Sequence, residues 1–168
     1  GGFYGGNAED EEFRELMIRW FQFGVYCPIL RMHGYRMPYV EKGSMDDMSG
    51  ECNTGGPNEI WSFGEEAYQI MRAYLDVRKK LVPYIQGQLR ITRENGTPLM
   101  RPLVYDFPED KNVADLSDEY MFGTDILAAP VMEYGRRSRE VYLPAGSKWK
   151  EEITGKTFEG GCTVQGAA

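Results

Sequence analysis

The hydrophobic period of the chain changes near Pro102, and this change constrains the fold more than any other feature of the sequence. Before Pro102 the apolar residues recur with the spacing of amphipathic helices. After Pro102 they form short apolar segments separated by Gly, Pro and Asp turns, a pattern typical of antiparallel strands. We therefore predict an α/β part over residues 1–102 and an antiparallel β part over residues 103–168.

Two helices with wide apolar faces are predicted in the first part. One spans residues 8–23, with Asn7 as its N-cap and acidic residues in its first turn, where they complement the helix dipole. The other begins at the Ser62-Phe63-Gly64-Glu65 capping box and runs to Glu94. Helices of this kind need a sheet to cover their apolar faces. The residues of the two faces are Phe13, Leu16, Met17, Trp20 and Phe21, and Ile70, Tyr74, Val77, Leu81 and Tyr84.

A short apolar run between the two helices, Val25–Met32, is bounded by Gly24 and Gly34 and predicts a buried strand of a parallel sheet. His33, the single histidine of the chain, directly follows this strand, where α/β folds present side chains to ligands. The residues alone leave ligand binding and a purely structural role equally open for His33. Arg31 would point to the same side of the strand, and a buried ion pair is the expected role of its guanidinium group. A long loop without periodicity, residues 34–61, comes next.

The second part contains short apolar segments that predict strands. They are Leu103–Phe107, Tyr120–Phe122, Ile126–Met132 and Glu140–Leu143.

Composition excludes several classes of partner. The net charge of −7 and the pI near 4.9 argue against nucleic acid, which requires clustered Lys and Arg. No apolar stretch approaches the roughly 18 residues of a membrane span, so no membrane partner is expected. The three cysteines, Cys27, Cys52 and Cys162, show no CxxC spacing, so we expect free thiols and a reducing, cytoplasmic location.

No motif in the sequence supplies a complete catalytic or metal site. The glycine-rich segment of residues 1–6 fits neither GxGxxG nor a P-loop. Neighbouring acidic residues Glu9 to Glu12 point in different directions on a helix and cannot converge on one ion. One histidine excludes a two-histidine metal site, and residues 1–101 contain no convincing carboxylate pair. We therefore predict no catalytic residue, no metal and no cofactor in this chain.

A series of short motifs, spread in order over nearly the whole chain, is similar to glycoside hydrolase family 31, which includes α-xylosidases and α-glucosidases. The motifs are Gly1-Gly2-Phe3, Arg19-Trp20-Phe21-Gln22-Phe23-Gly24, Arg31-Met32-His33-Gly34, Leu81-Val82-Pro83-Tyr84, Gly96-Thr97-Pro98, Arg101-Pro102-Leu103, Gly123-Thr124-Asp125-Ile126-Leu127-Ala128-Ala129-Pro130-Val131 and Val141-Tyr142-Leu143-Pro144.

The resemblance implies a fold and a domain division. Residues 1–102 would form the C-terminal part of a (β/α)8 TIM barrel, its last strand-helix units, because a full barrel needs about 250 residues. Residues 103–168 would form the start of the following β-sandwich domain.

The resemblance also implies site residues and a reaction. His33 would hydrogen-bond sugar hydroxyls beside the scissile bond, Phe3 would line the sugar pocket, and Arg31 would support His33. The nucleophile and the acid/base aspartate of the family would lie upstream of residue 1, so this chain alone is expected to be inactive. The complete enzyme would be a retaining α-glycosidase that acts on oligosaccharides without a metal or organic cofactor.

Substrate choice rests on a smaller set of residues. The sequence Arg31-Met32-His33-Gly34-Tyr35-Arg36 resembles the α-xylosidase branch of the family and favours hydrolysis of terminal α-xylosyl residues. An α-glucosidase of the same family is the first alternative. A non-catalytic carbohydrate-binding or interaction module, and a structural piece that associates with a second copy of itself as a homo-oligomer, are the others.

Overall fold

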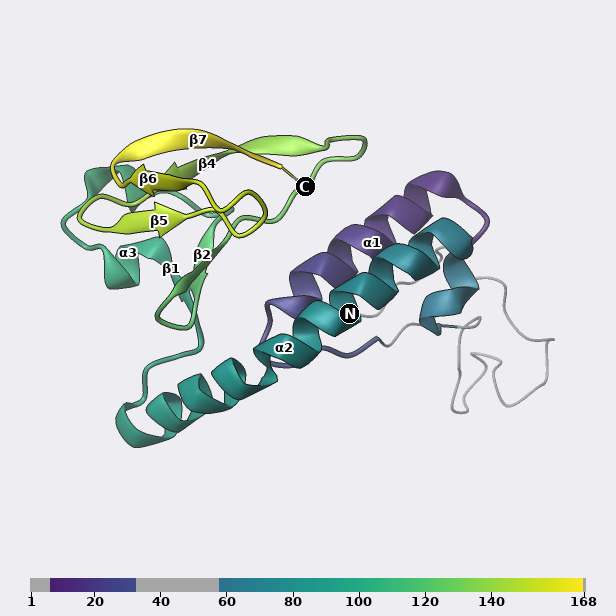
Figure 1. Ribbon diagram of the computed structural model, residues 1–168, viewed down its shortest axis with the longest axis horizontal. Coiled ribbons are helices and arrows are strands. Elements are labelled where there is room, and N and C mark those ends of the chain that lie inside the picture. Colours follow the sequence, from purple (N-terminus) through teal and green to yellow (C-terminus); the bar gives the residue numbers. More distant parts are fainter. Residues whose placement is uncertain (1–6, 33–57, 168) are drawn as a thin grey trace, which may run out of the picture. The chain divides into compact units, whose positions relative to one another are not determined.

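The computed structural model describes residues 7–32 and 58–167 and contains two compact units, Gly1–Leu81 and Val82–Ala168 (Figure 1). The helices of the described residues are α1 (Glu11–Val25), the 3₁₀ helix η1 (Ile60–Phe63), α2 (Glu65–Asn95), α3 (Leu103–Asp106) and the 3₁₀ helix η2 (Lys111–Val113). The strands are β1 (Met100–Pro102), β2 (Tyr120–Phe122), β3 (Ile126–Ala128), β4 (Ser138–Leu143), β5 (Lys148–Lys150), β6 (Thr157–Glu159) and β7 (Cys162–Ala167). The unit boundary falls inside α2, and the domain boundary predicted at residue 102 stays a prediction.

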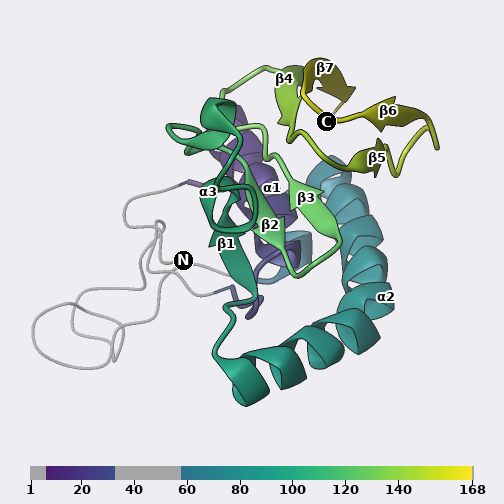
Figure 2. The same ribbon diagram turned by 90° about the vertical axis from the view of Figure 1, so that its left-hand side faces the viewer.

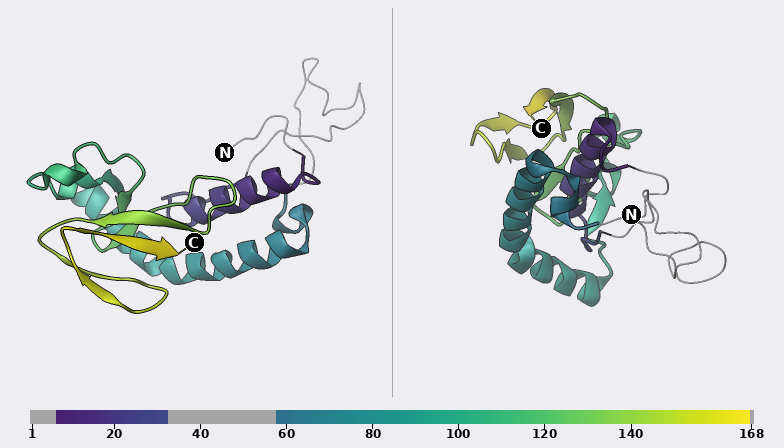
Figure 3. Two further views of the ribbon diagram at one scale, coloured as in Figure 1. Left: turned by 90° about the horizontal axis from the view of Figure 1, so that it is seen from above. Right: turned by 90° about the vertical axis from the view of Figure 1, so that its right-hand side faces the viewer.

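The first unit is built on α1 and the first part of α2, which lie side by side and run in the same direction (Figure 3). One apolar stripe of each helix meets the other, because the buried residues recur at helical spacing. The buried residues of this core are Phe13, Met17, Phe21, Val25, Phe63, Ala67 and Met71. Two neighbouring helices that run in parallel require the chain to return between them, as in a βαβ arrangement.

The first helix begins and ends later than its sequence predicts. The side chain of Asp10 accepts a hydrogen bond from the Glu12 backbone N–H at 3.1 Å and is the N-cap. The prediction of Asn7 as the N-cap is wrong, because Asn7 Oδ1 accepts a hydrogen bond from the Glu9 N–H in the turn that precedes the helix. The helix also passes through Gly24, where a Cβ would lie 2.8 Å from Leu30 Cδ1. Gly24 therefore lies in close contact with the Leu30 side chain and does not terminate the helix.

The second helix has the predicted length but a different start. Ser62 does not cap it, because the Ser62 hydroxyl donates to Glu59 Oε2 within the turn that contains η1. Gly64 has a φ of +88°, and α2 begins at the next residue. From there the helix continues through Pro83 to Asn95. The capping-box prediction is wrong and the prediction of a long helix is confirmed.

The described strands of the second unit pair antiparallel, as the sequence predicts. Figure 2 shows β1, β2 and β3 side by side in a three-stranded sheet, in which Arg101 faces Met121 and Met121 faces Leu127. Strands β4 and β7 form a second ladder, and β5 and β6 form a third. The core of this unit contains Leu103, Val113 and Met121. Its arrangement as a β-sandwich stays a prediction.

The strand predicted for Leu103–Phe107 is wrong, because Leu103–Asp106 is a helical turn. Buried Arg101 donates from Nε and Nη2 to the two carboxylate oxygens of Asp106, at 2.8 and 3.0 Å. An extended chain would separate these residues by about 17 Å, so this bidentate ion pair requires the chain to turn back.

Candidate functional site

The three predicted binding residues lie at the edges of the first described segment or beyond it. His33 and Phe3 lie outside the described residues, and their roles stay predictions. Arg31 is described and exposed, and it makes no hydrogen bond or ion pair within residues 7–32 and 58–167. The buried ion pair expected of Arg31 is therefore wrong for this chain, because its side chain is not enclosed in a sheet.

The segment that leads to His33, residues 26–32, forms turns, bends and irregular backbone rather than the predicted strand. A strand of a parallel sheet is stabilised by backbone hydrogen bonds to its neighbours. Within the described part of the first unit, no other strand is present to make them. The strand prediction for Val25–Met32 is wrong for this chain.

Arg78 of α2 satisfies the backbone of this segment instead. Its Nη1 donates to the carbonyl oxygens of Val25 and Cys27, both at 2.6 Å, and its Nη2 donates to the Pro28 carbonyl at 2.9 Å. Hydrogen bonds from a charged donor are stronger than neutral ones. One side chain of α2 thus holds the chain at the point where it leaves α1.

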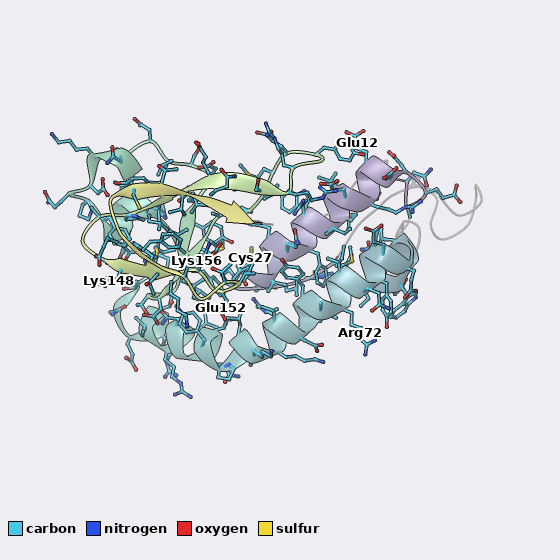
Figure 4. All side chains as sticks on the ribbon, turned by 45° about the horizontal axis from the view of Figure 1, so that its top comes forward. Glu12, Cys27, Arg72, Lys148, Glu152 and Lys156 are labelled. Carbon is cyan, nitrogen blue, oxygen red and sulfur yellow. The ribbon has the colours of Figure 1, made fainter. Side chains whose placement is uncertain are left out.

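The thiol of Cys27 lies in the same place, just past the end of α1 (Figure 4). Its Sγ donates to the Phe23 carbonyl at 3.4 Å. Burial raises the pKa of Cys27, and the positive charge of Arg78 partly offsets that rise. Burial in turn lowers the pKa of Arg78. The thiol is therefore protonated at neutral pH and poorly suited to act as a nucleophile.

An open cavity of about 120 Å³ lies beside this turn. Its walls are mainly apolar, and Arg31 is the charged residue among them. They comprise Met17, Trp20, Phe21, Phe23, Gly24, Cys27, Ile29, Leu30, Arg31 and Met32. Trp20 and Ile29 leave 47% and 80% of their surface exposed, so this side of α1 offers apolar area for packing rather than an array of polar groups.

Arg78 was missed by sequence reasoning, although a signal for it exists. It lies on the same face of its helix as Tyr74 and Leu81, both of which pack on the core of the first unit. A charged residue within an apolar stripe needs polar partners, and the carbonyl groups of a neighbouring turn are among the groups that can supply them.

No group of three or more His, Cys, Asp or Glu side chains in residues 7–32 and 58–167 could hold a metal ion. No described helix combines the length and the apolar character needed to cross a membrane. Cys27 and Cys162 are free thiols, and Cys52 lies outside the described residues.

Two family models together match nearly the whole chain. Residues 1–88 match the glycosyl hydrolases family 31 TIM-barrel domain, and residues 96–168 match the glycosyl hydrolase family 31 C-terminal domain. These matches support a partial barrel followed by a β domain.

Individual relatives carry xylosidase and glucosidase names. The chain is 39% identical to an alpha-xylosidase of Saccharolobus solfataricus, over 96% of the chain and 19% of the relative. It is 32% identical to alpha-glucosidase 2 of Bacillus thermoamyloliquefaciens, over 88% of the chain and 16% of the relative. A solved GH31 alpha-xylosidase from a soil metagenome, complexed with xylose, is 46% identical with a TM-score of 0.92, over 100% of the chain and 25% of that structure. The chain thus spans less than a fifth of the length of these two curated relatives.

Proposed function

Because the chain belongs to glycoside hydrolase family 31, we propose that it forms the last strand-helix units of the catalytic barrel of an α-xylosidase and the start of its next β domain. The complete enzyme would hydrolyse terminal α-xylosyl residues of oligosaccharides. An α-glucosidase of the same family is the second candidate, and the glucosidase names among the relatives favour it.

The observation that carries the xylosidase proposal is the likeness to the α-xylosidase solved with xylose. That structure matches the whole of this chain at 46% identity and a TM-score of 0.92. The identity of 39% to the Saccharolobus solfataricus α-xylosidase exceeds the 32% identity to the Bacillus thermoamyloliquefaciens α-glucosidase. Both comparisons favour an α-xylosidase over an α-glucosidase.

The part proposed for this chain in the reaction is substrate binding. In a retaining α-glycosidase one carboxylate attacks the anomeric carbon, and a second carboxylic acid protonates the leaving oxygen and then activates water. We place both carboxylates in the remainder of the enzyme. His33 would hydrogen-bond hydroxyls of the sugar beside the scissile bond, with Phe3 against the sugar and Arg31 as a neighbour that supports His33.

The choice between the two sugars is decided by kinetics of the complete enzyme. Xylose lacks the hydroxymethyl group that glucose carries on C5, and a pocket shaped for xylose would reject this group by steric contact. We expect kcat/KM to be at least about tenfold higher for an aryl α-xyloside than for the matched aryl α-glucoside. The aryl β-xyloside is the control, because it tests the anomeric configuration. A preference for the α-glucoside would make the enzyme an α-glucosidase instead.

A further inference from the structure

Asn95-Gly96 is the single Asn-Gly pair of the sequence, and it lies where α2 ends and a short connection leads to β1 (Figure 2). We propose that this pair is a site of spontaneous deamidation, in which the Gly96 backbone nitrogen attacks the side-chain carbonyl carbon of Asn95. The inference does not rest on the proposed function, because it uses only residues of the second unit. It assigns a chemical modification, with water as the co-reactant, to a segment outside the candidate site.

The space around the pair is open. Both residues are exposed, and a Cβ on Gly96 would meet nothing within 4 Å. Attack on the side chain closes a ring on the Gly96 nitrogen, and glycine does not crowd its own nitrogen with a side chain. Asn112 offers the contrast, because it is exposed but precedes the buried and β-branched Val113. The amide nitrogen of Asn112 is also held, since it donates to Asp110 Oδ1 and to Tyr142 Oη.

The side chain of Asn95 is already folded toward the nitrogen that would attack it. Its Oδ1 accepts a hydrogen bond from the Thr97 backbone N–H at 3.0 Å. This turn brings the side-chain carbonyl group back over the peptide bond between Asn95 and Gly96. Negative charge develops on Oδ1 during the attack, and the Thr97 N–H points at that oxygen. The same hydrogen bond therefore stabilises the tetrahedral intermediate as an oxyanion-hole donor would.

The last turn of α2 opposes the reaction and controls its rate. The Gly96 N–H donates to the Thr92 carbonyl at 2.9 Å, so the nitrogen is engaged while this turn is closed. Helix ends fray, and the free energy of opening is small there. The attack therefore starts from the opened turn, and any change that weakens the end of α2 should accelerate it.

The reaction exchanges one carbon–nitrogen bond for another. The electron pair of the Gly96 nitrogen forms a bond to Asn95 Cγ, and the bond between Cγ and Nδ2 breaks. The proton of the Gly96 N–H leaves with the amide nitrogen as ammonia, and a cyclic imide remains. Water then adds to one of the two imide carbonyl groups, which opens the ring to aspartate or isoaspartate and restores the Gly96 N–H. Either product places a negative charge at the C-terminus of α2, where the helix dipole disfavours it.

The test incubates the complete enzyme at mildly alkaline pH and follows its tryptic peptides by mass spectrometry. Cleavage after Arg93 and Lys111 places Asn95 and Asn112 in separate, neighbouring peptides. We expect Asn95 to convert to aspartate and isoaspartate at least about tenfold faster than Asn112, because Gly96 leaves its nitrogen uncrowded. Asn95→Gln should abolish the mass change of the first peptide. Equal rates at the two asparagines would overturn the proposal.

A matched pair of variants tests the control by the last turn of α2. Glu94→Gly and Glu94→Ala both remove the same exposed carboxylate, but only glycine destabilises the helix. We expect Asn95 to deamidate roughly fivefold faster in Glu94→Gly than in Glu94→Ala, because the opened turn is more populated. Far-UV circular dichroism checks that both variants fold. The same rate in both variants would show that α2 does not control the reaction.

Discussion

Glu119 carries a carboxyl group that is buried in the second unit. One of its oxygens accepts a hydrogen bond from the Tyr142 backbone N–H at 2.8 Å and lies 3.5 Å from Arg139 Nη2. The other oxygen is buried and has no hydrogen-bond partner among residues 7–32 and 58–167. Burial raises the pKa of Glu119, against the opposing effects of the Tyr142 hydrogen bond and the Arg139 charge, and the charge of Asp118 raises it further.

This raised pKa predicts how the stability of the chain changes with pH. The folded state holds the proton of Glu119 more tightly than the unfolded chain, whose carboxyl has its ordinary pKa near 4.5. The contribution to stability is therefore present below that value and is lost as the pH rises through the raised pKa. In Glu119→Gln this loss should disappear, so Tm should fall less between pH 4.5 and neutrality than in the wild type.

Thermal unfolding followed by circular dichroism over this pH range checks the prediction. Glu140→Gln is the matched control, because Glu140 is an exposed glutamate of β4. Parallel pH profiles for the wild type and Glu119→Gln would show that Glu119 is not responsible.

The turn between β2 and β3 packs tightly against the second part of α2. Tyr84 Oη donates to the Phe122 carbonyl and accepts from the Asp125 N–H, both at 3.0 Å. Gly123 lies between these two contacts with a φ of +70°, and a Cβ there would collide with the Tyr84 ring. The turn therefore needs glycine both for its backbone conformation and for its packing.

Substitution of Gly123 should separate these two needs. Gly135 has a similar φ of +74°, but a Cβ there would meet nothing within 4 Å. We expect Gly135→Ala to cost about 1 kcal/mol through backbone strain alone, and Gly123→Ala to cost about 1–3 kcal/mol more through overpacking. Urea unfolding of both variants measures the difference. Equal losses would mean that the contact with Tyr84 does not limit the turn.

Local sequence signals predicted α1, α2, β2, β3 and β4, but they did not predict β1, β5, β6 or β7. The bounds of β2 agree with the prediction at both ends, β3 begins at the predicted residue, and β4 ends at the predicted residue. The long helix α2 also follows its pattern to within a residue at its C-terminus. In each case the hydrophobic period and the turn residues lie within the element itself or next to it, so the sequence contains the signal.

Predictions failed where a single polar side chain decides the backbone. Arg78 binds the Val25 carbonyl across 53 residues, and the helical period, which places Arg78 in an apolar stripe, does not identify this partner. Arg101 binds Asp106 and turns an apolar run into a helix, although the run itself is suited to a strand. The same holds for the candidate site. His33 and Phe3 were proposed as binding residues through the family resemblance, whereas Arg78, which binds the backbone of the turn after α1, was not predicted.

The activity proposed here belongs to the complete enzyme, of which the chain covers a small part. The two curated relatives compared above are more than five times as long as the stretch that they share with it. We predict that the purified chain hydrolyses neither aryl α-xylosides nor aryl α-glucosides, because we place the nucleophile and the acid/base in the remainder of the enzyme. A chromogenic assay measures this. Turnover that disappears when a residue of this chain is replaced by Ala would contradict it.

The most direct test of the sugar-binding role is the kcat/KM of the complete enzyme and of its His33→Ala variant on an aryl α-xyloside. The far-UV circular dichroism and the Tm of both proteins serve as controls for folding. We predict a loss of about tenfold or more with little change in Tm, because a hydrogen bond that strengthens in the transition state contributes directly to the rate. An unchanged kcat/KM would show that His33 does not bind the sugar.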